Sequence, residues 1–170
     1  MISQIVDNSF QGILNRLNQS QFRFQTENQL NNDLYNEKQR RAEELFKIAT
    51  GFRTIPANAH GPSCLDGFLV NNGQFKAGYE VKTRNDSIAR LESYGSFILT
   101  KKKVENCISV CSLLYIPFIA ICYSIPDDAI RYWFVSNDRG VLTNNFRQEK
   151  KFLNKIQEDV FHFPFNQSFS

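Results

Sequence analysis

The stretch that decides the fold spans residues 66–82, with the sequence DGFLVNNGQFKAGYEVK. Two apolar segments flank a turn at residues 71–73, which is the pattern of a β-hairpin. Asp66 interrupts an apolar run, where a carboxylate is costly unless a positive charge pairs with it. Glu80 and Lys82 share one face of the second strand, about 7 Å apart, because side chains alternate along a strand. The hairpin therefore predicts a cluster of Asp66, Glu80 and Lys82.

The connection between the two strands decides whether Asp66 and Glu80 share a face of the hairpin. A two-residue loop would place Asp66 opposite Tyr79 and separate the two carboxylates onto opposite faces. A three-residue loop, with Gly73 in the left-handed conformation, would make them diagonal neighbours on one face. A bulge at Gly78 would restore the same parity. A catalytic cluster therefore predicts one of these two devices, whereas an ion pair on a solvated sheet face needs neither.

Composition indicates one globular core. The 170 residues are 42% hydrophobic and include 16 Phe, enough for a single aromatic-rich domain. The net charge is only +3, so any affinity for nucleic acid must come from local clusters of Lys and Arg. The four cysteines lie in apolar segments without zinc-site spacing, and we expect them to be reduced. Neither a secretory leader nor a bilayer-spanning run is evident, which favours a cytoplasmic protein in a bacterium or a phage-infected host.

The order of predicted elements indicates an α/β fold with a mixed central sheet and helices on its faces. We expect an N-terminal arm, residues 1–32, to precede a domain at 33–170. In chain order the predicted elements are a helix near 5–17, an Asn/Gln-rich linker at 18–36, a helix at 33–50, strands near 52–56, 64–70 and 74–82, a charged loop, a helix at 100–115 that crosses between parallel strands, strands at 118–124 and 130–135, a helix at 144–158 and an aromatic tail at 161–165.

These residues and their order resemble the PD-(D/E)xK nuclease superfamily, with small phage or mobile-element nucleases the nearest in appearance. The likeness covers about residues 37–135. It rests on Leu65-Asp66-Gly67 followed by Glu80-Val81-Lys82, with Leu65 in place of the usual proline. The resemblance implies a restriction-endonuclease-like sheet formed by a helix, three strands, a helix and a further strand. It also implies a carboxylate on the first helix, either Glu43 or Glu44, and Glu44 is marginally favoured.

The resemblance further implies a metal-dependent phosphodiesterase that uses Mg²⁺, with Mn²⁺ as a substitute. Asp66, Glu80 and the Val81 carbonyl would hold the ion, since Mg²⁺ takes one or two carboxylates and keeps several waters. Glu44 could hold a second ion or anchor the water network. Lys82 would orient or deprotonate the attacking water, and the ion would offset charge in the transition state.

The expected partner is nucleic acid, with DNA favoured over RNA. Arg84, Lys101, Lys102 and Lys103 are the predicted phosphate contacts, because three consecutive Lys at a helix start oppose the helix dipole and so favour a functional reason. The alternative is a non-catalytic nucleic-acid-binding or interaction subunit on the same fold. The N-terminal arm is expected to contribute to a homodimer, because its short amphipathic helix cannot bury its apolar face alone.

Overall fold

The computed structural model describes residues 25–57, 65–153 and 155–170, with side chains described from residue 36 onward. The chain divides into two compact units, residues 1–37 and 38–170, and every described strand lies in the second. The predicted helix near 5–17 and the proposed dimer contact of the arm lie outside the described residues. Within the described part of the chain, no helix is long and apolar enough to cross a membrane.

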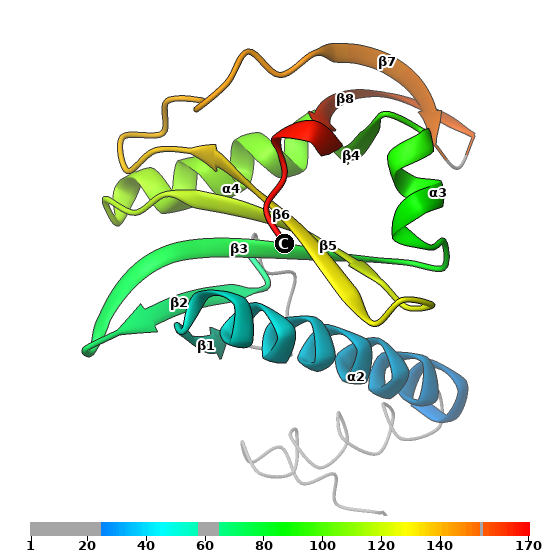
Figure 1. Cartoon of the computed structure of the whole chain (residues 1–170), viewed down its shortest axis with the longest axis horizontal. Coiled ribbons are helices and arrows are strands. Elements are labelled where there is room, and N and C mark those ends of the chain that lie inside the picture. Colours follow the sequence, from blue (N-terminus) through cyan, green and yellow to red (C-terminus); the bar gives the residue numbers. More distant parts are fainter. Residues whose placement is uncertain (1–24, 58–64, 154) are drawn as a thin grey trace, which may run out of the picture. The chain divides into compact units, whose positions relative to one another are not determined.

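The described residues form eight strands in two sheets, with helices before, between and after the strands. Figure 1 shows their arrangement. The helices are α2 (Gln25–Thr50), α3 (Ile88–Ser93), α4 (Lys101–Leu113) and a 3₁₀ turn, η1 (Phe165–Gln167). The central sheet has the order β1-β2-β3-β5-β6, and the small sheet has the order β4-β8-β7. Their bounds are β1 (Arg53–Pro56), β2 (Gly67–Asn71), β3 (Gln74–Arg84), β4 (Ser96–Thr100), β5 (Phe118–Ser124), β6 (Ala129–Ser136), β7 (Gln148–Leu153) and β8 (Ile156–Pro164).

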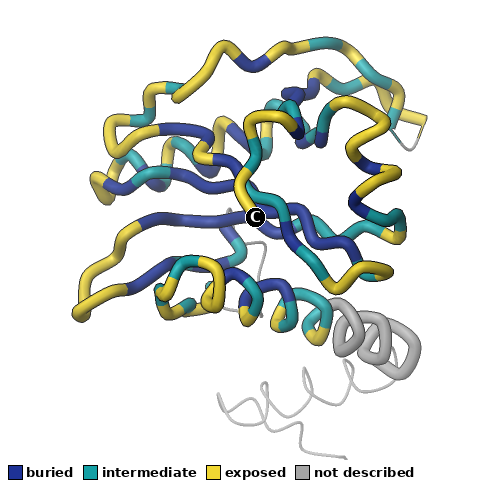
Figure 2. Tube along the Cα trace, viewed as in Figure 1, coloured by how far each residue is buried: buried dark blue, intermediate teal, exposed yellow. Residues whose placement is uncertain are grey.

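The central sheet confirms the predicted fold class. Helix α2 is followed by the antiparallel strands β1, β2 and β3, and β5 then pairs in parallel with β3 after the crossover that contains α4. This is the predicted restriction-endonuclease-like order of helix, three strands, helix and parallel strand. Strand β5 is buried along its whole length (Figure 2), because both faces of the sheet are covered.

Two apolar clusters cover the two faces. On one face, Ala42 and Phe46 of α2 pack with Tyr79 and Val81 of β3. On the other face, α4 packs against the sheet and against the aromatic residues of β8, as part of a larger cluster. Because alternate residues of β3 point to opposite faces, Glu80 and Lys82 project to the α4 side of the sheet.

Four predictions of local structure are wrong. Residues 25–36 belong to α2 rather than to a linker, and no Pro or Gly interrupts this polar segment. The predicted helix at 144–158 is instead β7 and the start of β8, because β7 pairs with β8 in a hairpin and the long-range pairing of β8 with β4 overrides the helix-forming Gln, Glu and Lys residues. The predicted aromatic tail is the buried end of β8, and the charged loop contains α3 and β4.

The β2–β3 hairpin settles the question of register. Its loop has two residues, since Asn71 pairs with Gln74, and Asn72 and Gly73 both have positive φ (50° and 72°), as a tight hairpin turn requires. The three-residue loop is therefore wrong. A bulge restores the parity, and its extra residue is Lys76 rather than Gly78.

Gly67, next to Asp66, is packed so closely that a side chain would displace its neighbours. A Cβ there would lie 2.3 Å from the Tyr79 hydroxyl and 2.6 Å from the Ile55 carbonyl oxygen. Gly67→Ala is expected to lower the free energy of unfolding by about 1–3 kcal/mol through overpacking. Urea denaturation of the purified variant measures the effect, and an unchanged midpoint would contradict this packing.

Candidate metal-dependent active site

The bulge brings Asp66 and Glu80 to the same side of the hairpin. Gly67 pairs with Tyr79, so continuing the register by one residue places Asp66 opposite Glu80. The Asp66 carboxylate accepts a hydrogen bond of 2.7 Å from the Val81 N–H, which fixes it beside the second strand. The structure thus brings together the two predicted acidic ligands, Asp66 and Glu80, and the backbone of Val81, whose carbonyl is the third predicted ligand.

Glu80 is an almost fully buried carboxylate between two lysines. Its exposure is 1%, and Lys82 Nζ lies 2.8 Å from Oε1 while Lys103 Nζ lies 2.9 Å from Oε2. Lys103 belongs to the first turn of α4, so the crossover helix delivers a second cation to the strand that carries Glu80 and Lys82. The sequence predicted Lys103 as a surface phosphate contact, and only the fold places it on Glu80.

The surroundings of Asp66 disfavour the charge of its carboxylate. Burial, together with repulsion from Glu80, raises the pKa of Asp66 from 3.8 to about 6, while the Val81 N–H and the charge of Lys82 act in the opposite direction. Two carboxylates held together in this way favour a cation between them. The pair fits Mg²⁺, which typically takes one or two protein carboxylates and keeps its waters. Among the described residues no cluster of three or more His, Cys, Asp or Glu forms a fuller metal cage.

The raised pKa of Asp66 gives a prediction for stability against pH. Folded Asp66 holds its proton up to about pH 6 while the unfolded group loses it near 3.8, so this group makes the folded protein less stable as pH rises between those values. Asp66→Asn, which still offers an oxygen to the Val81 N–H, removes this penalty. The free energy of unfolding of Asp66→Asn relative to wild type is therefore expected to rise from pH 4 to pH 7 in chelator. A pH-independent difference in urea titrations would contradict the assignment.

The carboxylate of α2 that faces the sheet is Glu43. It is 5% exposed, and its Oε1 accepts hydrogen bonds from the Tyr79 hydroxyl at 2.7 Å and from Gln39 Nε2 at 3.0 Å. Burial and the negative charges of Glu43 and Asp66 raise the pKa of Tyr79, so its hydroxyl interacts electrostatically with both carboxylates. The Tyr79 side chain thus connects Glu43 of α2 to the start of β2 at Gly67.

Glu44, the marginal choice from sequence, lies elsewhere. Its side chain is 60% exposed and pairs with Arg41 at 2.6 Å, and Arg41 also binds Asp128. Glu43 and Glu44 are adjacent residues of α2 and so point in different directions. Because Ala42 and Phe46 pack against the sheet, Glu43 points toward the sheet and Glu44 points away from it. This placement favours Glu43 as the helix carboxylate of the site.

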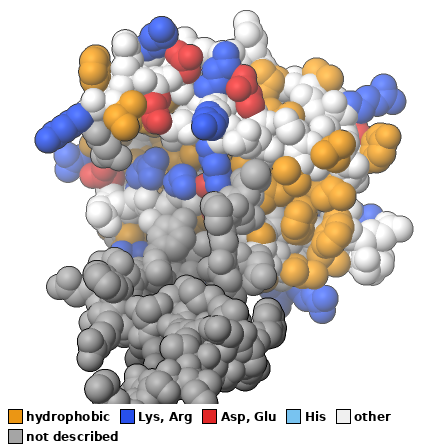
Figure 3. Space-filling view, turned by 180° about the vertical axis from the view of Figure 1, so that it is seen from behind, with side chains coloured by type: hydrophobic (Ala, Val, Ile, Leu, Met, Phe, Trp, Pro, Cys, Tyr) orange, Lys and Arg blue, Asp and Glu red, His pale blue; other side chains and the backbone are white. Residues whose placement is uncertain are grey.

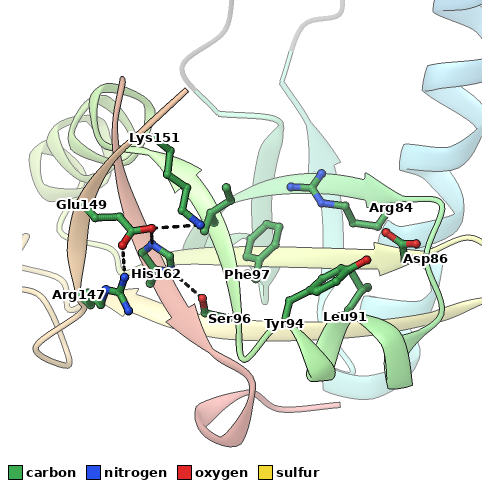
Figure 4. A pocket seen from close by; sticks show the side chains of 11 residues that line it. Arg84, Asp86, Leu91, Tyr94, Ser96, Phe97, Arg147, Glu149, Lys151 and His162 are labelled. Atoms are coloured by element: carbon green, nitrogen blue, oxygen red, sulfur yellow. Dashed lines mark hydrogen bonds and ion pairs between the residues drawn. The ribbon is translucent and has the colours of Figure 1, made fainter. Parts of the chain in front are cut away.

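Two clefts of about 540 Å³ each adjoin the cluster and share Arg84 and Ile98. The first contains Lys82 and Lys103 and extends to the β7–β8 hairpin. In the second, Arg84 and Tyr94 face Arg147 and Lys151 across the Phe97 ring (Figure 4). Arg84 stands over Phe97, with its guanidinium carbon 5.1 Å from the ring centroid. Of the other predicted phosphate contacts, Lys101 lies 3.8 Å from Glu105 and Lys102 is exposed.

His162 forms a buried polar cluster at the back of the second cleft. Its Nδ1 lies 2.6 Å from the Ser96 hydroxyl, and its Nε2 lies 2.9 Å from Glu149. Arg147 and Lys151 also bind Glu149, and the Arg147 contact is the main reason why the pKa of Glu149 falls to about 2. These contacts fix β7 against β8, and sequence reasoning missed them because it assigned this region to a helix.

Comparison with known proteins shows a likeness in fold but none in sequence. The sequence matches no family model and no curated protein. Among solved structures, the fold is similar to that of Hjc, a Holliday junction resolvase from the archaeal hyperthermophile Archaeoglobus fulgidus. The two chains are 15% identical, with 75% of this chain and 89% of Hjc covered and a TM-score of 0.47.

Proposed function

We propose that this protein is a metal-dependent nuclease that hydrolyses phosphodiester bonds in nucleic acid, with DNA the favoured substrate. The observation that carries the proposal is the buried Glu80 carboxylate, held between two lysines beside Asp66. A purely structural salt bridge of this kind is a poor source of stability, because desolvation offsets most of the attraction. Burial and repulsion from Glu80 disfavour the charge of the neighbouring Asp66 despite its hydrogen bond to the Val81 N–H, and such a perturbed carboxylate pair is typical of a functional site.

In this proposal Asp66, Glu80 and the Val81 carbonyl would hold a Mg²⁺ ion, and Glu43 would support them through its hydrogen bond with Tyr79. When bound, the ion supplies Lewis-acid chemistry, which polarises the phosphodiester and activates water. Lys82 Nζ, 2.8 Å from Glu80, positions the attacking water and can accept or return its proton. Lys103 balances the charge of Glu80 in the free protein and offers an ammonium group to the substrate phosphate.

The proposal is tested with end-labelled single-stranded DNA, duplex DNA, forked DNA and RNA in Mg²⁺ or Mn²⁺. Cleavage of at least one DNA substrate that chelator abolishes is the expected result. Binding without cleavage of any substrate would favour the non-catalytic nucleic-acid-binding alternative.

The first two lysines of α4, half-buried Lys101 and exposed Lys102, give a separate prediction for binding. Replacing Lys101 and Lys102 by Gln is expected to weaken binding of every sequence and to reduce the slope of log affinity against log salt by about 1–2, because each phosphate contact releases a counterion. Lys103 is left in place because it contacts Glu80. The control replaces Lys47 and Arg53, two exposed cations of α2 and β1, and an equal change in both double variants would reassign Lys101 and Lys102 to a solvated surface.

A further inference from the structure

The hairpin of β7 and β8 carries large exposed apolar side chains on both of its faces. Phe152 is 76% exposed and Ile156 is 62% exposed. Phe152 pairs with Gln157 and Leu153 pairs with Ile156, so Phe152 projects to one face of the ribbon while Leu153 and Ile156 project to the other. Packing against the protein core could account for apolar side chains on only one face of the ribbon. The apolar side chains on the other face therefore need another explanation.

This apolar end lies at the candidate active site. Phe152 and Leu153 line the same cleft as Lys82 and Lys103. A strand whose scissile phosphate reached the two lysines would therefore present its neighbouring bases to the hairpin.

The hairpin is anchored to β4 at one end and carries exposed lysines near its apolar end. Strand β8 pairs with β4 along its second half, where Phe161 and Phe163 are buried. Lys150 and Lys155 are exposed near the apolar residues, although Glu158 and Asp159 lie on the paired strand. In Figure 3 the upper part of the surface carries hydrophobic side chains interspersed with both basic and acidic ones. Apolar groups with cations beside them suit the flat faces of bases and the phosphates between them.

We propose that the β7–β8 hairpin is a stacking wedge that takes an unstacked base next to the scissile phosphate. Phe152 lies against one base face, and Leu153 with Ile156 contacts the adjoining base step. The hairpin thereby selects nucleic acid with a boundary between paired and unpaired bases over continuous duplex. This inference rests on the proposed nuclease function, because the cleft that the hairpin lines is the catalytic one.

The experiment measures binding in chelator, so that it does not depend on cleavage. The probes are a forked duplex and a continuous duplex of the same length, each with 2-aminopurine at the same position, which is the last base pair before the fork. Wild type is expected to bind the fork more tightly and to change 2-aminopurine fluorescence only there. Phe152→Ala combined with Ile156→Ala is expected to lose about tenfold or more in affinity for the fork, with continuous-duplex binding unchanged.

Two further variants sharpen the test. Phe152→Tyr keeps an aromatic face and should retain the fork preference. Leu113→Ala removes an equally exposed side chain, 79% accessible at the end of α4, and should change nothing. Equal losses on both probes, or an unchanged fork preference in the double alanine variant, would overturn the wedge. Absence of cleavage by a protein that keeps this fork preference would instead count against the nuclease alone.

Discussion

Glu80→Gln is expected to reduce the rate of metal-dependent cleavage by about a thousandfold or more, which is the loss typical when a group central to transition-state charge stabilisation is removed. Glu80 is the one carboxylate in the cluster that is almost fully buried, and both of its oxygens face ammonium groups at 2.8 and 2.9 Å. The amide keeps the shape of the side chain but removes the charge that a divalent ion needs.

The same substitution leaves Lys82 and Lys103 without their buried counter-charge, so the fold of the variant must be checked. Far-ultraviolet circular dichroism and affinity for nucleic acid in chelator are expected to show a folded protein that still binds. Glu44→Gln is the control, because that side chain is exposed and pairs with Arg41 instead. Wild-type turnover by folded Glu80→Gln would exclude catalysis at this cluster.

Lys82→Met is expected to lower turnover by about a hundredfold to ten-thousandfold, the range typical of a lost general acid or base, while metal still binds. Lys82 projects from β3 into the cleft with its side chain 36% exposed, so its ammonium group can reach both Glu80 and a water in the cleft. Lys76→Met on the same strand is the matched control, because Lys76 contacts Gln74 near the turn.

The outcome for Lys82 is read from single-turnover rates together with metal affinity. A slow rate with wild-type metal affinity supports a role at the water. An equal loss of metal affinity in Lys82→Met and Asp66→Asn would contradict it, because the lysine would then act by holding the carboxylates in place.

Local patterns in the sequence predicted the central sheet and the acidic residues. The apolar run of β5, the Thr100 helix start and the hairpin composition were sufficient, since each depends on near neighbours in the chain. The small sheet was missed because β4 pairs with β8, a strand some 60 residues later in the chain, and Gln148–Leu153 forms a strand by pairing with β8 in turn. The short apolar run Phe97-Ile98-Leu99 was the signal for β4 that the sequence offered.

Details within the site depended on three-dimensional packing. The catalytic interpretation required an irregularity in the hairpin that would put Asp66 and Glu80 on the same face. The position of that bulge at Lys76, however, depends on how β2 and β3 twist together. The choice between Glu43 and Glu44 depends on which side of α2 faces Tyr79. The contact of Lys103 with Glu80 depends on where the crossover helix begins relative to β3, which no local pattern encodes.

The central claim, that Asp66 and Glu80 together hold a divalent ion, is tested most directly by titrating chelator-treated protein with Mn²⁺ and counting bound ions by electron paramagnetic resonance. The account predicts saturable binding to wild type that is strongly weakened in both Asp66→Asn and Glu80→Gln, with Glu44→Gln unaffected. Binding of wild-type strength in either of the first two variants would contradict it.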